Sequence, residues 1–216
     1  MSTAPNKTIV QQLQKQVAYK FPQVLTKWDE YIPLPTGIHL IDQKLLQGGL
    51  PRGHLIEIVG SKSSGKTRLI FYMLSGLNKK EGRIAYFDFS GTFYPPSAQE
   101  CGIDLKKVLV LRPANIQAGL RAGEILFRSG AISVAVFDLV GTKDQILKAL
   151  FLRLKKSVKK VGGIGIFLRE RDSTDVQRNQ VALCLKVKKR KMKLSIKTEK
   201  SLFGNENQGV ELVLNG

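Results

Sequence analysis

The chain has 216 residues, of which 43% are hydrophobic and 7% are aromatic. This length suits one well-buried core with short extensions, and the composition is typical of globular proteins. No apolar run approaches the roughly 20 residues that span a bilayer, and the first residues, MSTAPNKTIVQQLQKQ, lack the continuous hydrophobic region of a secretory signal. We therefore expect a cytoplasmic protein with no membrane partner.

Charge is unevenly distributed along the chain. The formal net charge is +18, and residues 143–200 contain 18 Lys or Arg against 5 Asp or Glu. A basic surface of this kind attracts polyanions, so we expect a partner such as DNA. The two cysteines, Cys101 and Cys184, are far apart and have no CxxC spacing, which predicts free thiols rather than a disulfide framework or a zinc site.

The N-terminal segment differs from the rest of the chain. It has a short amphipathic pattern around residues 9–19, followed by an extended connection that contains proline. We assign residues 1–33 to an N-terminal helix and linker, and residues 34–216 to one core domain with basic C-terminal strands.

The central part of the chain alternates strand and helix patterns. Short β-branched runs occupy residues 54–59, 83–89, 107–112, 132–138 and 162–169. Helical spacing is found between them at 67–78 and 116–130, where Gly130 is placed to end the helix. This alternation predicts an α/β fold, with a mostly parallel sheet covered by helices on both faces.

The last third changes to a two-residue period. The segment 181–200, VALCLKVKKRKMKLSIKTEK, predicts two antiparallel strands joined near Lys189 and Arg190. A turn at GNENQG and a final strand at 210–215 follow. The lysines are expected on one face of these strands. The apolar residues expected on the opposite face are Leu183, Leu185, Val187, Met192, Leu194 and Ile196.

The segment GSKSSGKT, Gly60 to Thr67, matches the phosphate-loop pattern G-x-x-x-x-G-K-S/T at every fixed position. It follows a strand and opens a helix, so its backbone N–H groups and the helix dipole converge on a phosphate. Lys66 would reach the β- and γ-phosphates of ATP. The alternative is a loop retained only for packing. The predicted nucleotide-binding residues are Gly60, Ser61, Ser63, Ser64, Gly65, Lys66, Thr67 and Arg68.

A magnesium ion that accompanies the nucleotide needs oxygen ligands. The Thr67 hydroxyl supplies one, and Asp138 supplies another because it ends a strand of four consecutive apolar residues. The alternative role for Asp138 is an N-cap of a helix that starts near Thr142.

The lysines of the last third predict sequence-independent contact with DNA phosphates. A solvated strand edge that lysines protect from aggregation is the alternative. The predicted DNA-binding residues are Lys155, Lys156, Lys159 and Lys160 in a helix, with Lys186, Lys188, Lys191, Lys193 and Lys197 in the strands.

Several of these motifs occur in the order found in the RecA recombinase family. The segments PTGIHLID, GGLPRGHLIEIVGSKSSGKT and FRSGAISVAVFD resemble that family, and the similarity runs from about residue 34 to residue 140. The resemblance implies a RecA-like fold, ATP and Mg²⁺ as cofactors, DNA as a partner and a homo-oligomer.

Two positions depart from the RecA pattern. In active members a glutamate two residues beyond the aspartate of the strand at 83–89 polarises the attacking water, whereas here Ser90 follows Asp88 at that spacing. A hydroxyl cannot act as a general base without a partner base, so hydrolysis is expected to be weak or absent. Asp88 could replace the glutamate only if its strand continues through Ser90. The γ-phosphate-sensing glutamine corresponds to Glu170, which would repel that phosphate.

The connections that carry the DNA-binding loops in recombinases are short in this chain, which argues against strand exchange. Overall length and the segment AGLRAGEILFRSGAISVAVFDL resemble the ImuA family of bacterial accessory proteins for DNA-damage-induced (SOS) translesion synthesis. This resemblance implies a nucleoid-associated protein whose partners are a Y-family-like polymerase homologue and an error-prone polymerase. The alternatives are an active DNA-dependent ATPase, such as a RecA paralogue or recombination mediator, and a SulA- or KaiC-like regulator.

Overall fold

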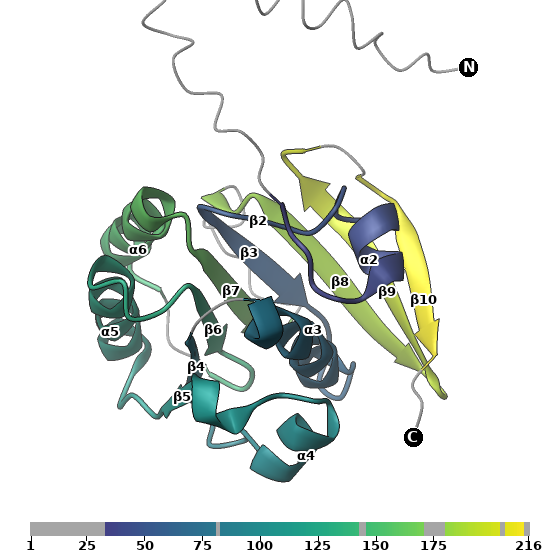
Figure 1. Cartoon of the computed structure of the whole chain (residues 1–216), viewed down its shortest axis with the longest axis horizontal. Helices are drawn as coiled ribbons and strands as arrows, with labels where there is room; N and C mark the ends of the chain where they lie inside the picture. The colour runs from purple at the N-terminus through teal and green to yellow at the C-terminus, as the bar shows by residue number, and fades with distance from the viewer. Residues whose placement is uncertain (1–32, 81–82, 143–145, 171–179, 204–205, 214–216) are drawn as a thin grey trace, which may run out of the picture. The chain divides into compact units, whose positions relative to one another are not determined.

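The computed structural model describes residues 33–80, 83–142, 146–170, 180–203 and 206–213. The amphipathic helix expected at 9–19 lies outside these ranges. The described residues form an α/β core built on an eight-stranded sheet (Figure 1), so the predicted fold class is confirmed.

The elements follow the alternation expected from the sequence. The strands are β1 (Pro33–Leu34), β2 (Leu50–Pro51), β3 (His54–Val59), β4 (Ile84–Asp88), β5 (Val108–Leu111), β6 (Val134–Asp138), β7 (Ile164–Arg169), β8 (Leu183–Arg190), β9 (Lys193–Ser201) and β10 (Gly209–Val213). The helices are α2 (His39–Lys44), α3 (Lys66–Lys80), α4 (Pro95–Glu100), the 3₁₀ turn η1 (Leu105–Lys107), α5 (Ile116–Arg128) and α6 (Lys148–Val161).

The main sheet has the strand order β10-β9-β8-β3-β7-β6-β4-β5, and β1 and β2 form a separate two-stranded sheet. All neighbours from β8 to β5 are parallel, whereas β8, β9 and β10 are antiparallel to one another. The carboxyl ends of β3, β7, β6 and β4 therefore meet at one edge of the sheet, which is where ligands bind in open parallel sheets.

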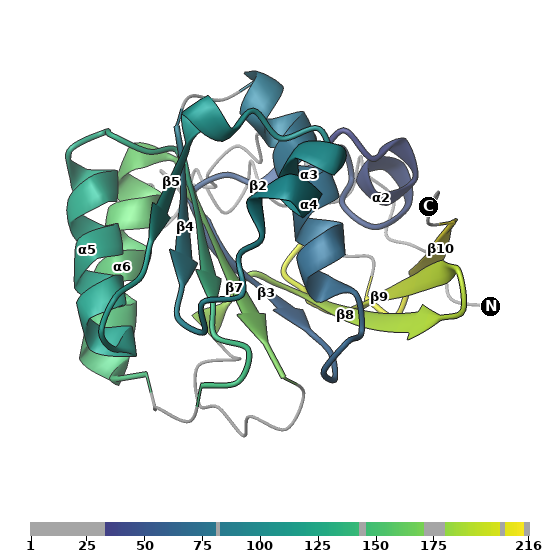
Figure 2. The same cartoon turned by 90° about the horizontal axis from the view of Figure 1, so that it is seen from below.

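Helices cover both faces of the sheet, as Figures 1 and 2 show. On one face α2, α3 and α4 lie over a core that includes Leu69, Met73 and Leu77. On the other face α5 and α6 cover the rings of Phe87, Phe137 and Phe167, which pair across β4, β6 and β7. Their centroids are 4.5 and 4.9 Å apart along this stack. Burial on both faces explains the near-continuous apolar runs of the central strands.

Three local predictions were wrong. The β8–β9 turn is at Lys191 and Met192 rather than at Lys189 and Arg190, and Lys191 adopts a positive φ of 51°. Met192 therefore lies outside the apolar face, and 56% of its surface is exposed. Helix α6 begins at Lys148 rather than near Thr142. In each case the local sequence pattern predicted that the element exists. The residue at which it begins or ends depends on strand pairing or on packing against the sheet, which the pattern does not contain.

The helix end predicted at Gly130 is confirmed. Gly130 has a φ of +71° just after α5, and its N–H donates to the carbonyl of Phe127, as a helix-ending glycine does. Both cysteines are free thiols, with Cys184 buried and Cys101 half-buried. Within the described ranges, no helix has the length and hydropathy needed to cross a bilayer.

Candidate nucleotide site and basic surface

The phosphate loop connects the central strand β3 to the first turn of α3. Ser63 and Gly65 have φ values of 56° and 87°, so the loop turns tightly before the helix begins. The N–H of Gly60 donates to the carbonyl of Arg169 at 3.2 Å, which fixes the start of the loop against β7. The backbone N–H groups at the start of α3 are thereby held at the carboxyl edge of the sheet, as anion binding requires.

Lys66 is the buried cation of this loop. Only 4% of the residue is exposed, and its Nζ donates to the carbonyls of Gly60 at 2.7 Å and Ser61 at 2.8 Å. Burial lowers the pKa of Lys66, and the negative charges of Glu170 and Asp138 oppose this shift. The ammonium held by the loop carbonyls is thus influenced by two acidic side chains, Glu170 just after β7 and Asp138 at the end of β6.

Asp138 ends β6 and is 1% exposed. The hydroxyl of Tyr86 donates to its Oδ2 at 2.6 Å, and the N–H of Val140 donates to its Oδ1 at 3.3 Å. Burial raises the pKa of Asp138, and the Tyr86 hydrogen bond partly opposes that shift. The alternative role for Asp138 as a helix N-cap is not supported, because α6 starts ten residues further on, at Lys148.

The residues around Asp138 fit a magnesium ion bound together with a nucleotide. Within the described ranges, no three His, Cys, Asp or Glu side chains are grouped to hold a metal by themselves. Mg²⁺ is commonly held by one or two protein oxygens together with phosphates and water. Thr67 and Asp138 supply oxygen donors of that kind, and a divalent cation would offset the cost of burying the Asp138 charge.

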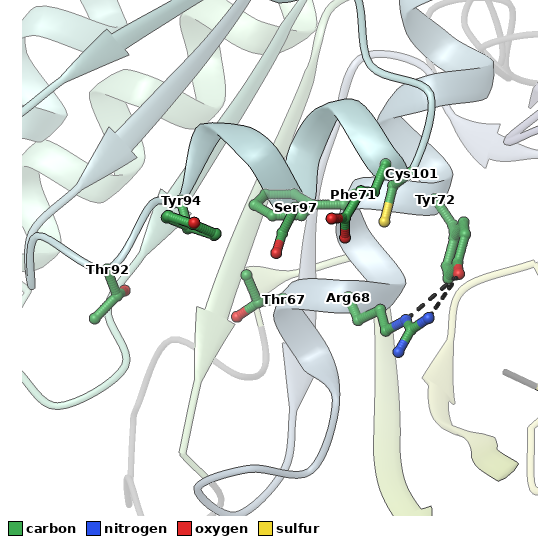
Figure 3. Close-up of a pocket in the computed structure, with 9 residues that line it drawn as sticks. Thr67, Arg68, Phe71, Tyr72, Thr92, Tyr94, Ser97 and Cys101 are labelled. Carbon is green, nitrogen blue, oxygen red and sulfur yellow. Dashed lines mark hydrogen bonds between the residues drawn. The ribbon is translucent and has the colours of Figure 1, made fainter. Parts of the chain in front are cut away.

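A wide groove of about 1000 Å³ lies beside the phosphate loop, between α3 and α4 (Figure 3). Thr67, Arg68 and Tyr72 line it from α3, and Tyr94, Ser97 and Cys101 line it from α4 and its two ends. The Arg68 guanidinium lies 5.8 Å from the centre of the Tyr72 ring. Thr67 and Arg68 also line the smaller cavity at the loop, so the groove adjoins the phosphate site. Its aromatic and polar lining suits a base and a ribose.

Asp88 does not take the place of the missing glutamate. Strand β4 ends at Asp88 rather than continuing through Ser90, so the condition for that substitution is not met. The carboxylate instead accepts hydrogen bonds from the N–H groups of Thr92 at 2.9 Å and Phe93 at 3.2 Å, and from Arg112 Nε at 3.3 Å. Asp88 therefore shapes the loop that leads into α4, and the exposed Ser90 hydroxyl lies 3.0 Å from that of Thr92.

A basic surface forms on the side of the sheet that α6 covers. Lys186 lies directly opposite Lys197 in the β8–β9 pair, and Lys188 follows on the same face. Lys155 of α6 donates to Gln180 at 3.2 Å and Lys200 of β9 donates to the carbonyl of Val181 at 2.8 Å, so α6 and β9 bring cations close together. Burial lowers the pKa of Lys155, and the charges of Lys200 and Lys159 add to that effect. The structure thus joins two lysine-rich segments that are separate in the sequence.

The predicted lysines do not all contribute equally to this surface. Lys186 pairs with Glu199 at 2.6 Å, and Lys193 pairs with Glu211 at 3.3 Å. The prediction that Lys191 lies on the strand face was wrong, because it lies in the turn. Lys156 and Lys160 share a different stripe of α6 from Lys155 and Lys159, since residues four apart lie on the same helix face.

Two site residues were missed from the sequence. Tyr86 touches Asp138 because β4 and β6 are neighbours in the sheet, with Asp88 opposite Asp138. Lys189 lines the cavity at the phosphate loop, although it looks like one more lysine of the basic run. The alternating pattern of 181–200 did contain a signal for Lys189, since it has the parity of Leu185 and Val187.

A phosphate loop after the central strand, with an aspartate two strands away, defines a P-loop protein with a mostly parallel sheet. The chain belongs to the RecA family, because the sequence profile described as RecA N-terminal domain matches residues 8–146. Protein RecA of Bifidobacterium breve is 39% identical over 107 residues, which are 50% of this chain and 27% of that protein. Protein RecA of Clostridium beijerinckii is 30% identical over 155 residues, 63% of this chain and 43% of that protein. The chain thus spans less than half the length of these relatives.

Among solved structures, the crystal structure of the RadB recombinase has a TM-score of 0.68 and 17% sequence identity. The similarity covers 83% of this chain and 95% of that one. It shows that the two chains share the RecA-like fold.

We predict that Tyr86→Phe lowers the free energy of unfolding by about 1–3 kcal/mol, because a buried carboxylate oxygen loses its donor. The hydroxyl stabilises the charged form of Asp138, so the loss should be largest where this carboxyl is ionised in the folded protein. It should shrink as the pH falls through the raised pKa and the carboxyl becomes protonated. Urea unfolding across a pH series measures the effect. Tyr94→Phe is the control, since Tyr94 is 60% exposed. A loss that does not change with pH would contradict the assigned contact.

Proposed function

We propose that this protein binds ATP with Mg²⁺ and contacts DNA phosphates without reading sequence. We further propose that it is an accessory protein of DNA-damage-induced translesion synthesis with weak or no ATP hydrolysis. The observation that carries the proposal is that the groups expected to hold a nucleotide are found around Lys66, while the group expected to activate water is replaced. Residues of the kind that would hold a nucleotide are present, namely the loop itself, Thr67 and Asp138. The position expected to hold the base has the exposed Ser90 hydroxyl.

Glu170 supports the same conclusion. Its negative charge, like that of Asp138, opposes the lowering of the Lys66 pKa by burial. A carboxylate so placed accepts hydrogen bonds only, so it cannot donate to a γ-phosphate as the glutamine of active relatives does. Binding without efficient turnover suits a protein that uses its nucleotide as a structural or switching element.

The basic surface supports DNA as the polyanion. Lys188 and Lys197 are exposed, and Lys155 and Lys159 approach from α6. Like charges placed together on neighbouring strands repel, and a phosphate backbone offsets that repulsion while it releases counterions. Partnership with a Y-family-like polymerase homologue and an error-prone polymerase rests on the resemblance to the ImuA family, and binding between the purified proteins is the direct test.

The first prediction concerns nucleotide binding. Lys66→Ala should weaken ATP binding by at least about a hundredfold, because it removes the one buried ammonium of the loop. Titration calorimetry with Mg²⁺ and ATP measures the dissociation constant. The exposed Lys44 on α2 provides the control Lys44→Gln. Equal ATP affinity in the wild type and Lys66→Ala would show that the loop serves packing alone.

The second prediction concerns hydrolysis. With saturating ATP and single-stranded DNA, turnover should stay below about 0.01 per second, against roughly 1 to 1000 per second for ordinary enzymes. Phosphate release measures it, and Lys66→Ala provides the background of contaminating ATPase. DNA-stimulated turnover in the ordinary range would instead favour the active ATPase, a recombination mediator or RecA paralogue.

The third prediction concerns DNA. The double variant Lys188→Gln/Lys197→Gln should weaken binding to all sequences alike and reduce the slope of log affinity against log salt by about 2, one per lost phosphate contact. Fluorescence anisotropy across a salt series measures both. Lys44→Gln/Lys106→Gln is the charge-matched control, since both lysines are exposed on other elements. Wild-type binding that shows no salt dependence would exclude the DNA-phosphate role and favour a protein partner.

A further inference from the structure

The β8–β9 hairpin extends past the central strand and lies beside the phosphate loop. Strand β8 runs parallel to β3, and the last β3 residue, Val59, is opposite Lys186. Residues 187–190 of β8 therefore continue beyond β3, where the loop begins. Figure 1 shows the turn of this hairpin beyond the carboxyl end of β3.

Contacts with the two fixed glycines of the loop show how closely the hairpin approaches it. A Cβ at Gly60 would lie 2.5 Å from the carbonyl oxygen of Val187, and one at Gly65 would lie 2.3 Å from a methyl carbon of Leu194. Leu194 is buried and is the direct strand partner of Lys189. The backbone at Lys189 is thus held in place against the loop by the packing of its partner.

Alternation along β8 gives its lysines different environments. Leu185 and Val187 point into the core beneath α3, and Lys189 has the same parity. Lys188 has the opposite parity and belongs to the basic surface on the α6 side. The adjacent residues Lys188 and Lys189 therefore lie on opposite faces of the same strand.

We propose that Lys189 is a further ligand of the nucleotide polyphosphate, contributed in cis from β8. The inference rests on the proposed nucleotide binding. Lys189 lines a cavity of about 290 Å³ together with loop residues 63–68 and Val140. Lys66 reaches this site from α3 and is buried, whereas Lys189 reaches it from β8 and is exposed. A polyphosphate chain in the cavity is thereby approached by cations from two different elements.

The chemistry matches a di- or triphosphate better than a monophosphate. The loop N–H groups and Lys66 would surround one phosphate group, while the exposed ammonium of Lys189 at the side of the cavity can pair with a second. An exposed lysine contributes less than the buried Lys66, so we expect a measurable but incomplete loss of affinity when its charge is removed.

The test uses the full chain and measures ATP and ADP affinity by titration calorimetry in the absence of DNA. Lys189→Gln should weaken binding of ATP about tenfold, and Lys189→Arg should retain most of it. The adjacent variant Lys188→Gln removes the same charge from the other face and should lower DNA affinity rather than nucleotide affinity. Lys44→Gln serves as the neutral control, and urea unfolding of each variant confirms that the fold is kept.

The outcomes separate this inference from the proposed function. If Lys66→Ala abolishes ATP binding while Lys189→Gln binds ATP as the wild type does, the role of Lys189 is excluded and nucleotide binding stands. Equal losses in Lys189→Gln and Lys188→Gln would also exclude it, because the effect would then be one of general charge. If the wild type and Lys66→Ala bind ATP equally, the proposed nucleotide site fails and the Lys189 role fails with it.

Discussion

The buried ammonium of Lys66 is the constraint around which the site is organised. A charge that is almost fully removed from water must be compensated, and here loop carbonyls and nearby carboxylates provide that compensation. The arrangement is only achieved because β7 lies between β3 and β6 in the sheet, so that Glu170, just after β7, and Asp138, at the end of β6, lie at neighbouring strand ends. The strand order therefore decides which acidic side chains surround the loop.

The same edge of the sheet carries the proposal that the site holds a nucleotide and hydrolyses it slowly or not at all. Asp138 accepts a hydrogen bond from Tyr86, and Asp88 accepts hydrogen bonds from backbone N–H groups of the loop before α4. Each of these two buried carboxylates thus already has hydrogen-bond donors that fix its position. Hydrolysis needs a base whose lone pair is directed at a water molecule, and a hydroxyl at Ser90 does not supply one at neutral pH.

The antiparallel C-terminal strands have two faces with different neighbours. Their apolar face packs beneath α3 and beside the phosphate loop, while their lysine face joins α6. One hairpin therefore contacts both the candidate nucleotide site and the candidate DNA surface. Because strand side chains alternate between faces, a run of consecutive lysines is divided between the two.

The sequence by itself determined the fold class, the phosphate loop and the candidate magnesium aspartate, because these depend on local pattern. Periodicity identified the strands, and the fixed spacing of Gly60, Gly65 and Lys66 identified the loop. Only the tertiary structure decided that Tyr86 meets Asp138, that Asp88 is occupied elsewhere and that Lys189 belongs with the loop rather than with its lysine neighbours. Those facts depend on which strands are adjacent and in what register, which local sequence does not encode. For Lys189 the alternation of 181–200 gave only its parity, and the pairing of β8 with β3 placed it beside the loop.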